Sequence, residues 1–318
     1  MKNRVKYIVL AILALPILLM LTLISWVISQ YLTNPLDFVD QPIENLSIVS
    51  DSVFQAEFLP EDRVYHSIIL QNTQQGEVRI LLSTPSEIPE EGLPVVIILG
   101  GLEVGKYTLK YIPDPGNNII ITYQYPYHPE YWYKGSAFEQ IPIIRSSVLT
   151  VPSQVLSLIN WISYQEWADN NKMTVTGYSF GALFIPAIYR LAAQNSIPIK
   201  YGVIAYGGSD LYQLLVTNMT NFDQPLRSLF SWLAAISLRG IEPAAHAPFM
   251  RAEFLVVNGT LDHQIPEDSW RELHSLIPEP KTIIILEEGH MHPRKVELTR
   301  RLVKLSHKWL IEKGVANE

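Results

Sequence analysis

A serine between two glycines is the first feature of the sequence that could do chemistry, in the run GYSFG (177–181). The run lies between a strand-like segment (172–179) and a segment with helical spacing (182–194). A tight strand-to-helix turn exposes a serine Oγ, and flanking glycines avoid clashes there. The start of the helix directs N–H groups and its positive dipole end toward developing negative charge. We predict that Ser179 is a nucleophile.

A serine hydroxyl needs a general base, and the base needs an acid to orient it. Asp262 follows the strand-like segment 252–259, and His290 follows the strand-like segment 281–289. Both residues therefore stand at carboxyl ends of strands, the edge where open α/β sheets place their sites. We predict a triad of Ser179, His290 as base and Asp262 as acid.

Weaker alternatives exist for both partners. His292 also follows the last strand and is the second candidate for the base. Glu287 and Glu288 are alternatives for the acid, but they adjoin the histidine in sequence rather than ending a separate strand.

Acyl transfer also needs two N–H donors for the oxyanion. The run LGGLE (99–103) ends a continuous apolar segment, and its paired glycines let backbone N–H groups approach a bound oxygen closely. We predict the N–H of Phe180 as one donor. The N–H of Leu102 is predicted as the other, with Gly101 as the alternative.

The segments that position these residues alternate between strand-like and helical patterns. An antiparallel opening precedes repeated βα units, which predicts an α/β fold with a mostly parallel sheet covered by helices on both faces. The predicted strands are 63–73, 76–85, 93–101, 117–127, 172–179, 200–208, 252–259 and 281–289, and the predicted helices are 151–167, 182–194 and 293–313.

From about residue 63 to the C-terminus the sequence resembles the α/β-hydrolase superfamily. The matching parts are VVIILGG, GYSFG, VVNGTLDHQIP and EEGHMHP. The tail, with its Gly-Thr-x-Asp-x-x-x-Pro and Gly-His elements, is similar to the dienelactone-hydrolase and prolyl-oligopeptidase-like branch. Gly100-Gly101 stands where that family usually has His-Gly. The resemblance implies a serine hydrolase that cleaves carboxylic esters through an acyl-enzyme intermediate.

Other functions remain open beside the esterase. A serine peptidase or an acyltransferase would use the same triad, and a non-catalytic, membrane-tethered binding protein would carry a broken one. We expect no cofactor and no metal, since cysteine is absent and the histidines lack metal-ligand spacing apart from His290-x-His292. The net charge of −7 disfavours nucleic acid as a partner.

The N-terminus predicts a membrane anchor. Residues 7–29 carry no charge, and as a helix they would span about 34 Å at 1.5 Å per residue, enough for a bilayer core. Lys2, Arg4 and Lys6 precede the span, which predicts a cytoplasmic N-terminus and an extracytoplasmic (periplasmic or lumenal) domain. A cleaved signal peptide is the alternative.

The sequence thus divides into a transmembrane anchor (1–30), a connector (31–60) and an α/β-hydrolase domain (61–318). Within the domain, residues 209–250 contain two apolar helical patterns and form either a cap over the site or an ordinary crossover with a decorated loop. An anchored enzyme with such a cap suits a small-molecule or lipid-like acyl substrate. An aromatic cluster lines a pocket or packs the sheet edge, and it comprises Tyr125, Tyr127, Tyr131, Trp132 and Tyr133.

Overall fold

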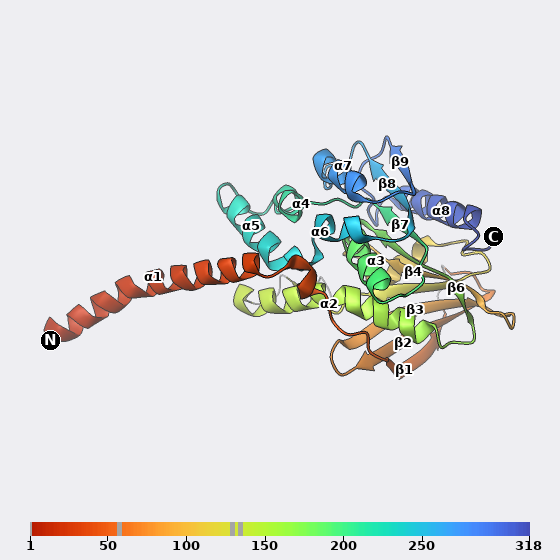
Figure 1. The fold of residues 1–318 in the computed structure, drawn as a ribbon, viewed down its shortest axis with the longest axis horizontal. Helices are drawn as coiled ribbons and strands as arrows, with labels where there is room; N and C mark the ends of the chain where they lie inside the picture. Colours follow the sequence, from red (N-terminus) through yellow and green to blue (C-terminus); the bar gives the residue numbers. More distant parts are fainter. Residues whose placement is uncertain (1, 56–58, 128–130, 133–135) are drawn as a thin grey trace.

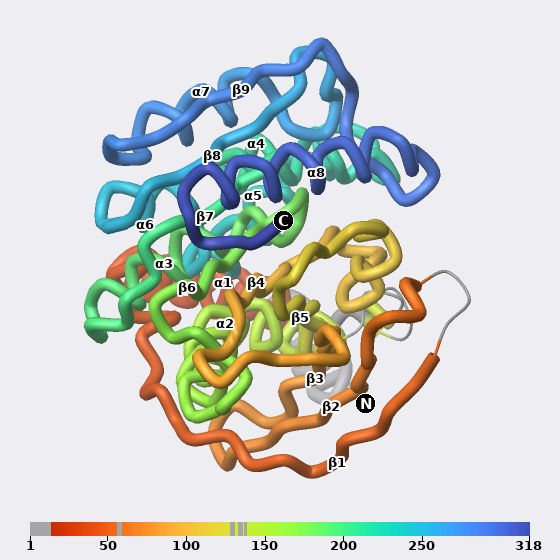
Figure 2. The backbone as a smooth tube through the Cα atoms, turned by 90° about the vertical axis from the view of Figure 1, so that its right-hand side faces the viewer, coloured from red at the N-terminus to blue at the C-terminus, as the bar shows by residue number. Residues whose placement is uncertain are grey.

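The computed structural model describes residues 2–55, 59–127, 131–132 and 136–318, and of residues 2–13, 137 and 138 only the backbone. Within that part of the chain one sheet has the strand order β1-β2-β3-β5-β4-β6-β7-β8-β9. Figure 2 shows β1 at one edge of the sheet and β9 at the other. The strands are β1 (Ser47–Phe54), β2 (Arg63–Asn72), β3 (Gly76–Pro85), β4 (Leu93–Leu99), β5 (Ile119–Gln124), β6 (Ala168–Tyr178), β7 (Tyr201–Ala205), β8 (Glu253–Gly259) and β9 (Lys281–Leu286).

Pairing within the sheet changes from antiparallel to parallel along this order. β1, β2 and β3 pair antiparallel, and β3 pairs antiparallel with β5. All remaining pairs, from β5 to β9, are parallel. The predicted mostly parallel sheet with an antiparallel opening is confirmed. Parallel strands place their carboxyl ends at one edge, which is where the predicted site residues follow.

The central strand β4 shows why the sequence selects this architecture. Its residues are all buried, and they alternate between two apolar cores. Val95 and Ile97 belong to the core under one face, whereas Val96 and Ile98 belong to the core under the other. A strand covered on both faces needs such an unbroken apolar run.

Helices cover both faces of the sheet (Figure 1). Residues of α2 (Ala137–Ile162), α3 (Ile185–Gln194) and α7 (Glu267–Leu276) pack in the first core. Residues of α8 (Val296–Glu312) and the 3-10 helix η2 (Gly105–Tyr111) pack in the second. The segment 209–250 contains α4 (Leu211–Asn218), α5 (Leu226–Leu238), η5 (Arg239–Ile241), α6 (Pro243–His246) and η6 (Ala247–Phe249).

Two elements differ from the sequence prediction. The stretch 31–60, predicted as a connector, contains the 3-10 helix η1 (Pro35–Phe38) and the edge strand β1, which pairs with β2. Helix α2 begins at Ala137 rather than near residue 151 and contains Pro142 and Pro152. Proline removes one helical hydrogen bond, so a proline in the sequence predicts a helix boundary. Packing against the sheet maintains the helix here.

Two helices among the described residues are long and apolar enough to cross a membrane. One is Glu139–Ile162 within α2, which is 56% buried and packs in the core. The other is Ala14–Leu32 within α1 (Lys2–Leu32), of which only 6% is buried. Figure 1 shows α1 leaving the domain as a single projecting helix. Its length and composition fit both an anchor and a signal sequence.

Because the side chain of His246 is buried, we predict that the folded protein loses stability in acid. Burial lowers the pKa of His246 from 6.5 to about 4. Its neutral ring accepts a hydrogen bond from Arg190 Nε at 3.0 Å and donates one to the Gly240 carbonyl at 2.8 Å. The unfolded chain, with its ordinary pKa, binds more protons between these two pH values. The contribution of His246 to the free energy of unfolding is therefore fully present above pH 6.5 and is lost as the pH drops toward 4.

We expect His246→Gln to flatten this pH dependence, because glutamine accepts from Arg190 without titrating. Urea unfolding between pH 7 and 4 measures it, and the difference in slope is up to about 1.4 kcal/mol per pH unit. Parallel curves for the variant and the wild type would show that His246 does not carry the effect.

Candidate active site

Ser179 stands at the junction of β6 and the 3-10 helix η4 (Ser179–Phe184), and α3 follows η4. Its φ of 54° lies in the left-handed region, which is rare for a residue with a side chain. Such strain persists only where the surroundings impose it, and it points the Oγ away from the sheet edge. The predicted strand–turn–helix context of this serine is present.

The flanking glycines are required by close packing at this turn. A Cβ on Gly177 would lie 2.5 Å from Ile185 Cγ1 and 2.7 Å from the Gly181 carbonyl oxygen. A Cβ on Gly181 would overlap the Leu99 backbone of β4. The two glycines therefore let β6, η4 and β4 approach closely enough to form the turn.

His290 and Asp262 meet Ser179 although they lie far away in sequence. The Ser179 Oγ is 2.7 Å from His290 Nε2, and His290 Nδ1 is 2.6 Å from Asp262 Oδ2. Both partners are almost fully buried, so water does not compete for these hydrogen bonds. With Nδ1–H donating to Asp262, Nε2 is free to accept the serine proton. The structure brings the three predicted residues together in this order.

The Asp262 carboxylate is held on both oxygens. Oδ1 accepts hydrogen bonds from the backbone N–H groups of Gln264 at 2.7 Å and Ile265 at 3.1 Å. Oδ2 is thereby directed at His290. The two backbone donors compensate part of the cost of burying a carboxylate.

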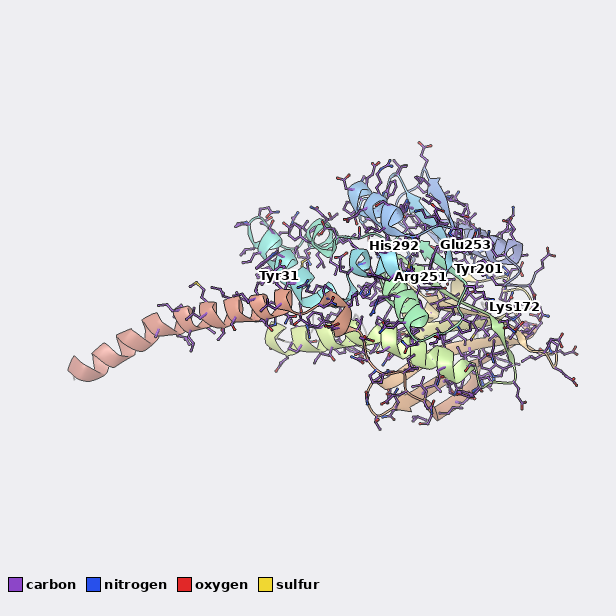
Figure 3. The ribbon with its side chains drawn as sticks, in the orientation of Figure 1. Tyr31, Lys172, Tyr201, Arg251, Glu253 and His292 are labelled. Carbon is purple, nitrogen blue, oxygen red and sulfur yellow. The ribbon has the colours of Figure 1, made fainter. Side chains whose placement is uncertain are left out.

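The alternative partners lie outside this relay. His292 is partly exposed, its Nδ1 accepts from the Arg294 N–H at 3.1 Å, and its Nε2 is 3.9 Å from Glu103. His292, labelled in Figure 3, lies in the segment between β9 and α8. Glu288 pairs with Arg301, and Glu287 is exposed.

Tyr125 connects the two segments that were predicted to supply oxyanion donors. Its hydroxyl donates to the Gly100 carbonyl at 2.5 Å, and its ring packs edge-on against Phe180 with centroids 5.0 Å apart. A Cβ on Gly101 would lie 3.9 Å from Ser179 Cβ, which places the glycine turn beside the serine. Leu102 follows in that turn. The specific roles of Phe180 and Leu102 remain predictions.

Many solved structures resemble this chain, and two esterases and a peptidase are among them. Acetyl xylan esterase 1 from Thermoanaerobacterium sp. JW/SL YS485 is 14% identical, with a TM-score of 0.61, over 87% of this chain and 90% of that one. An acetyl xylan esterase from Paenibacillus sp. R4 is 15% identical, with a TM-score of 0.59, over 86% and 92%. The acylaminoacyl peptidase of Pyrococcus horikoshii is 13% identical, with a TM-score of 0.55, over 82% of this chain and 48% of that one.

This chain has the α/β-hydrolase fold. The predicted resemblance to that superfamily is thus confirmed at the level of the fold. No family model matches the sequence, and no curated protein matches it.

Tyr206 also lies at this site and was not predicted from the sequence. It follows β7, and its ring stands edge-on to His290 with centroids 5.4 Å apart and an interplanar angle of 86°. Its hydroxyl is buried without a hydrogen-bond partner in the described structure. Burial, and then the charges of Asp262 and Glu288, raise the pKa of Tyr206 to about 12, so the phenol stays neutral. The feature of the sequence that could have indicated Tyr206 is its position at the carboxyl end of a strand.

Two members of the aromatic cluster, Tyr125 and Trp132, pack against the ring of Phe180 beside the serine. Trp132 and Phe184 contact the Phe180 ring edge-on, and Tyr125 is fully buried behind them. Tyr127 donates to the Gln140 side chain at 2.6 Å, and Tyr131 is exposed. Tyr133 lies outside the described residues.

Two alanine substitutions separate packing from chemistry at this turn. Gly181→Ala is expected to cost at least about 2 kcal/mol of stability, because its Cβ would overlap the Leu99 backbone. Gly101→Ala meets only ordinary contact with Ser179 Cβ at 3.9 Å, so stability is kept, but the methyl obstructs the space beside the nucleophile and lowers activity. Urea unfolding and ester hydrolysis measure the two effects. Equal destabilisation by both variants would contradict this geometry.

Proposed function

We propose that this chain is a serine hydrolase that cleaves carboxylic esters through an acyl-enzyme intermediate. The observation that carries the proposal is the hydrogen-bonded relay Ser179–His290–Asp262, with distances of 2.7 Å and 2.6 Å. Its order and orientation are those required for a serine nucleophile. A non-catalytic binding protein would have no need of this relay.

In the proposed mechanism His290 Nε2 takes the proton of Ser179 Oγ as the oxygen attacks the ester carbonyl carbon. Asp262 stabilises the imidazolium that forms, and the N–H groups of Phe180 and Leu102 donate to the tetrahedral oxyanion. The intermediate collapses, the C–O bond to the alcohol breaks, and His290 returns the proton to the leaving oxygen. Water then repeats the sequence on the acyl-enzyme, which releases the carboxylic acid and regenerates the serine.

The ester is favoured over other acyl substrates by the two acetyl xylan esterases, which align over 90% and 92% of their own length. A peptidase is the second candidate, because the chain also aligns with an acylaminoacyl peptidase, although over 48% of that protein. An acyltransferase would use the same relay with another acceptor in place of water. The three activities differ in the leaving group and in the acceptor.

We further propose that α1 is an uncleaved anchor with its N-terminus in the cytoplasm and the hydrolase domain on the other side of the membrane. Support comes from the exposed apolar surface of Ala14–Leu32 and from the basic residues before it. Carbonate-resistant sedimentation of the full chain is expected. A soluble protein that starts after Ser29 would refute the anchor in favour of a signal peptide.

Labelling with a fluorophosphonate tests the nucleophile, since such probes react with activated serines. We expect labelling of the full chain in detergent, and faster hydrolysis of p-nitrophenyl esters than of peptide p-nitroanilides. Absence of labelling would refute the serine hydrolase. Preferential cleavage of the anilides would favour the peptidase.

A further inference from the structure

An exposed apolar surface lies on α5 and the turn before it. Five large apolar side chains there are between 36% and 51% exposed. They recur at helical spacing, and the rings of Phe222 and Phe230 pack against each other with centroids 4.9 Å apart. The set comprises Phe222, Leu226, Leu229, Phe230 and Trp232. Contiguous exposed apolar groups on this scale mark a surface that something covers.

A second exposed apolar pair lies on the first turns of α2. Ile141 and Ile143 are 56% and 44% exposed, although the rest of α2 packs in the core. Figure 1 shows the start of α2 and the tip of α5 on the side of the domain from which α1 projects. The two sets, here called the apolar collar, therefore flank the base of α1.

The junction between α1 and the domain is short and hydrogen-bonded. The buried side chain of Gln30 accepts from Arg145 of α2 at 3.2 Å, and its carbonyl accepts from Arg239 at 2.5 Å. Arg145 also donates to the Ser237 carbonyl of α5 at 3.0 Å. The Tyr31 ring, labelled in Figure 3 at this junction, lies under the Arg239 guanidinium at 5.2 Å. These contacts fix α1, α2 and α5 together.

From this geometry we infer that the apolar collar inserts into the lipid bilayer that surrounds α1. The inference rests on the proposed role of α1 as an anchor. A bilayer that covers an apolar helix must reach the domain where the helix joins it, and here no flexible linker separates the two. Apolar side chains beside the helix, with Trp232 and Tyr31 among them, suit the interface between hydrocarbon and headgroups.

The apolar collar also lies beyond the edge of the sheet at which the parallel strands end and Ser179 follows. The chain reaches α2 from the carboxyl end of β5 and reaches α4 and α5 from the carboxyl end of β7, while Ser179 follows the carboxyl end of β6. All three strands are parallel members of one sheet, in which β4 lies between β5 and β6 and β7 pairs with β6. Insertion of the collar therefore turns the site toward the membrane, and the substrate class that reaches it is an ester of a membrane lipid.

Single cysteine labels on the full chain in lipid vesicles test the inference, because the natural sequence has no cysteine. A fluorophore is placed at Leu229→Cys and Ile143→Cys in the collar. Tyr164→Cys is the matched control, since it follows the opposite end of α2 and is 76% exposed. Leu19→Cys reports on the anchor. The quenchers are a spin-labelled phospholipid in the bilayer and iodide in the water.

We expect the phospholipid to quench the fluorophores at Leu229 and Ile143 severalfold more strongly than the one at Tyr164, which iodide quenches. Quenching by lipid at Leu19 but by iodide at Leu229 and Ile143 would overturn the collar and leave the anchor in place. Shielding of the collar from both quenchers would indicate a second copy of the chain instead. Quenching of Leu19 by iodide would overturn both anchor and collar.

A second measurement addresses the substrate class. Replacing both Leu229 and Phe230 with glutamate should lower hydrolysis of vesicle-embedded lipid esters severalfold, while hydrolysis of a water-soluble p-nitrophenyl ester stays unchanged. Equal loss on both substrates, or no loss on the lipid, would contradict the membrane-facing site. Fluorophosphonate labelling of the same variant shows separately whether the serine remains active.

Discussion

Replacing Ser179 with alanine is expected to lower kcat for ester hydrolysis by about 10⁴- to 10⁶-fold and to abolish fluorophosphonate labelling. The substitution removes the oxygen that lies 2.7 Å from His290 and leaves the rest of the relay in place. Stability should change little, because alanine meets the same left-handed backbone strain as serine at a φ of 54°. Steady-state kinetics and thermal unfolding in detergent measure the two quantities.

The matched control is Ser196→Ala. Ser196 is the other described serine with a positive φ, at 58°, and it is exposed. This variant should keep full activity and labelling. If Ser179→Ala keeps more than a hundredth of the wild-type kcat, or is labelled as strongly, the nucleophile lies elsewhere.

Asp262→Asn is expected to lower kcat by about 10⁴-fold, because the hydrogen bonds around this side chain fix the orientation of the amide. The N–H groups of Gln264 and Ile265, which now donate to Oδ1, require an acceptor at that position. The asparagine NH₂ must then face His290 Nδ1. His290 accepts from it only in the tautomer that carries its proton on Nε2, and such a nitrogen cannot take the serine proton.

Asp169→Asn is the control for this substitution. Asp169 Oδ1 also accepts from the N–H two residues along the chain, at 2.9 Å, but it lies at the opposite end of β6 from Ser179. The activity of the Asp169→Asn variant should equal that of the wild type. A small effect of Asp262→Asn would indicate that Glu287 or Glu288 orients the histidine.

The proximity of Ser179, His290 and Asp262 could be predicted from the sequence because each residue follows an apolar strand with a clear pattern. β6, β8 and β9 end at Ser179, Asp262 and His290 or within a few residues of them, and parallel strands bring such ends together. The hydrogen bonds that hold Asp262 come from local N–H groups. No residue type in the sequence encodes them.

The missed features depend on contacts between distant segments. β1 has the sequence SIVSDSVF and buries almost none of its side chains, so it has no apolar pattern, and its pairing with β2 stabilises it. Tyr206 looks like an ordinary aromatic residue after a strand, and only the arrival of His290 gives its ring a partner. Neither the strand β1 nor the role of Tyr206 could be predicted from local periodicity alone.

The hydrogen-bonded junction at Gln30 has a consequence for kinetics under the proposed anchoring. A domain held rigidly at the bilayer surface cannot tumble in search of substrate, so its encounters with a lipid ester are two-dimensional. The relevant concentration is then the mole fraction of ester in the membrane rather than its molarity in water. Diluting the substrate with inert lipid should slow turnover, whereas diluting the vesicles in buffer should leave it unchanged.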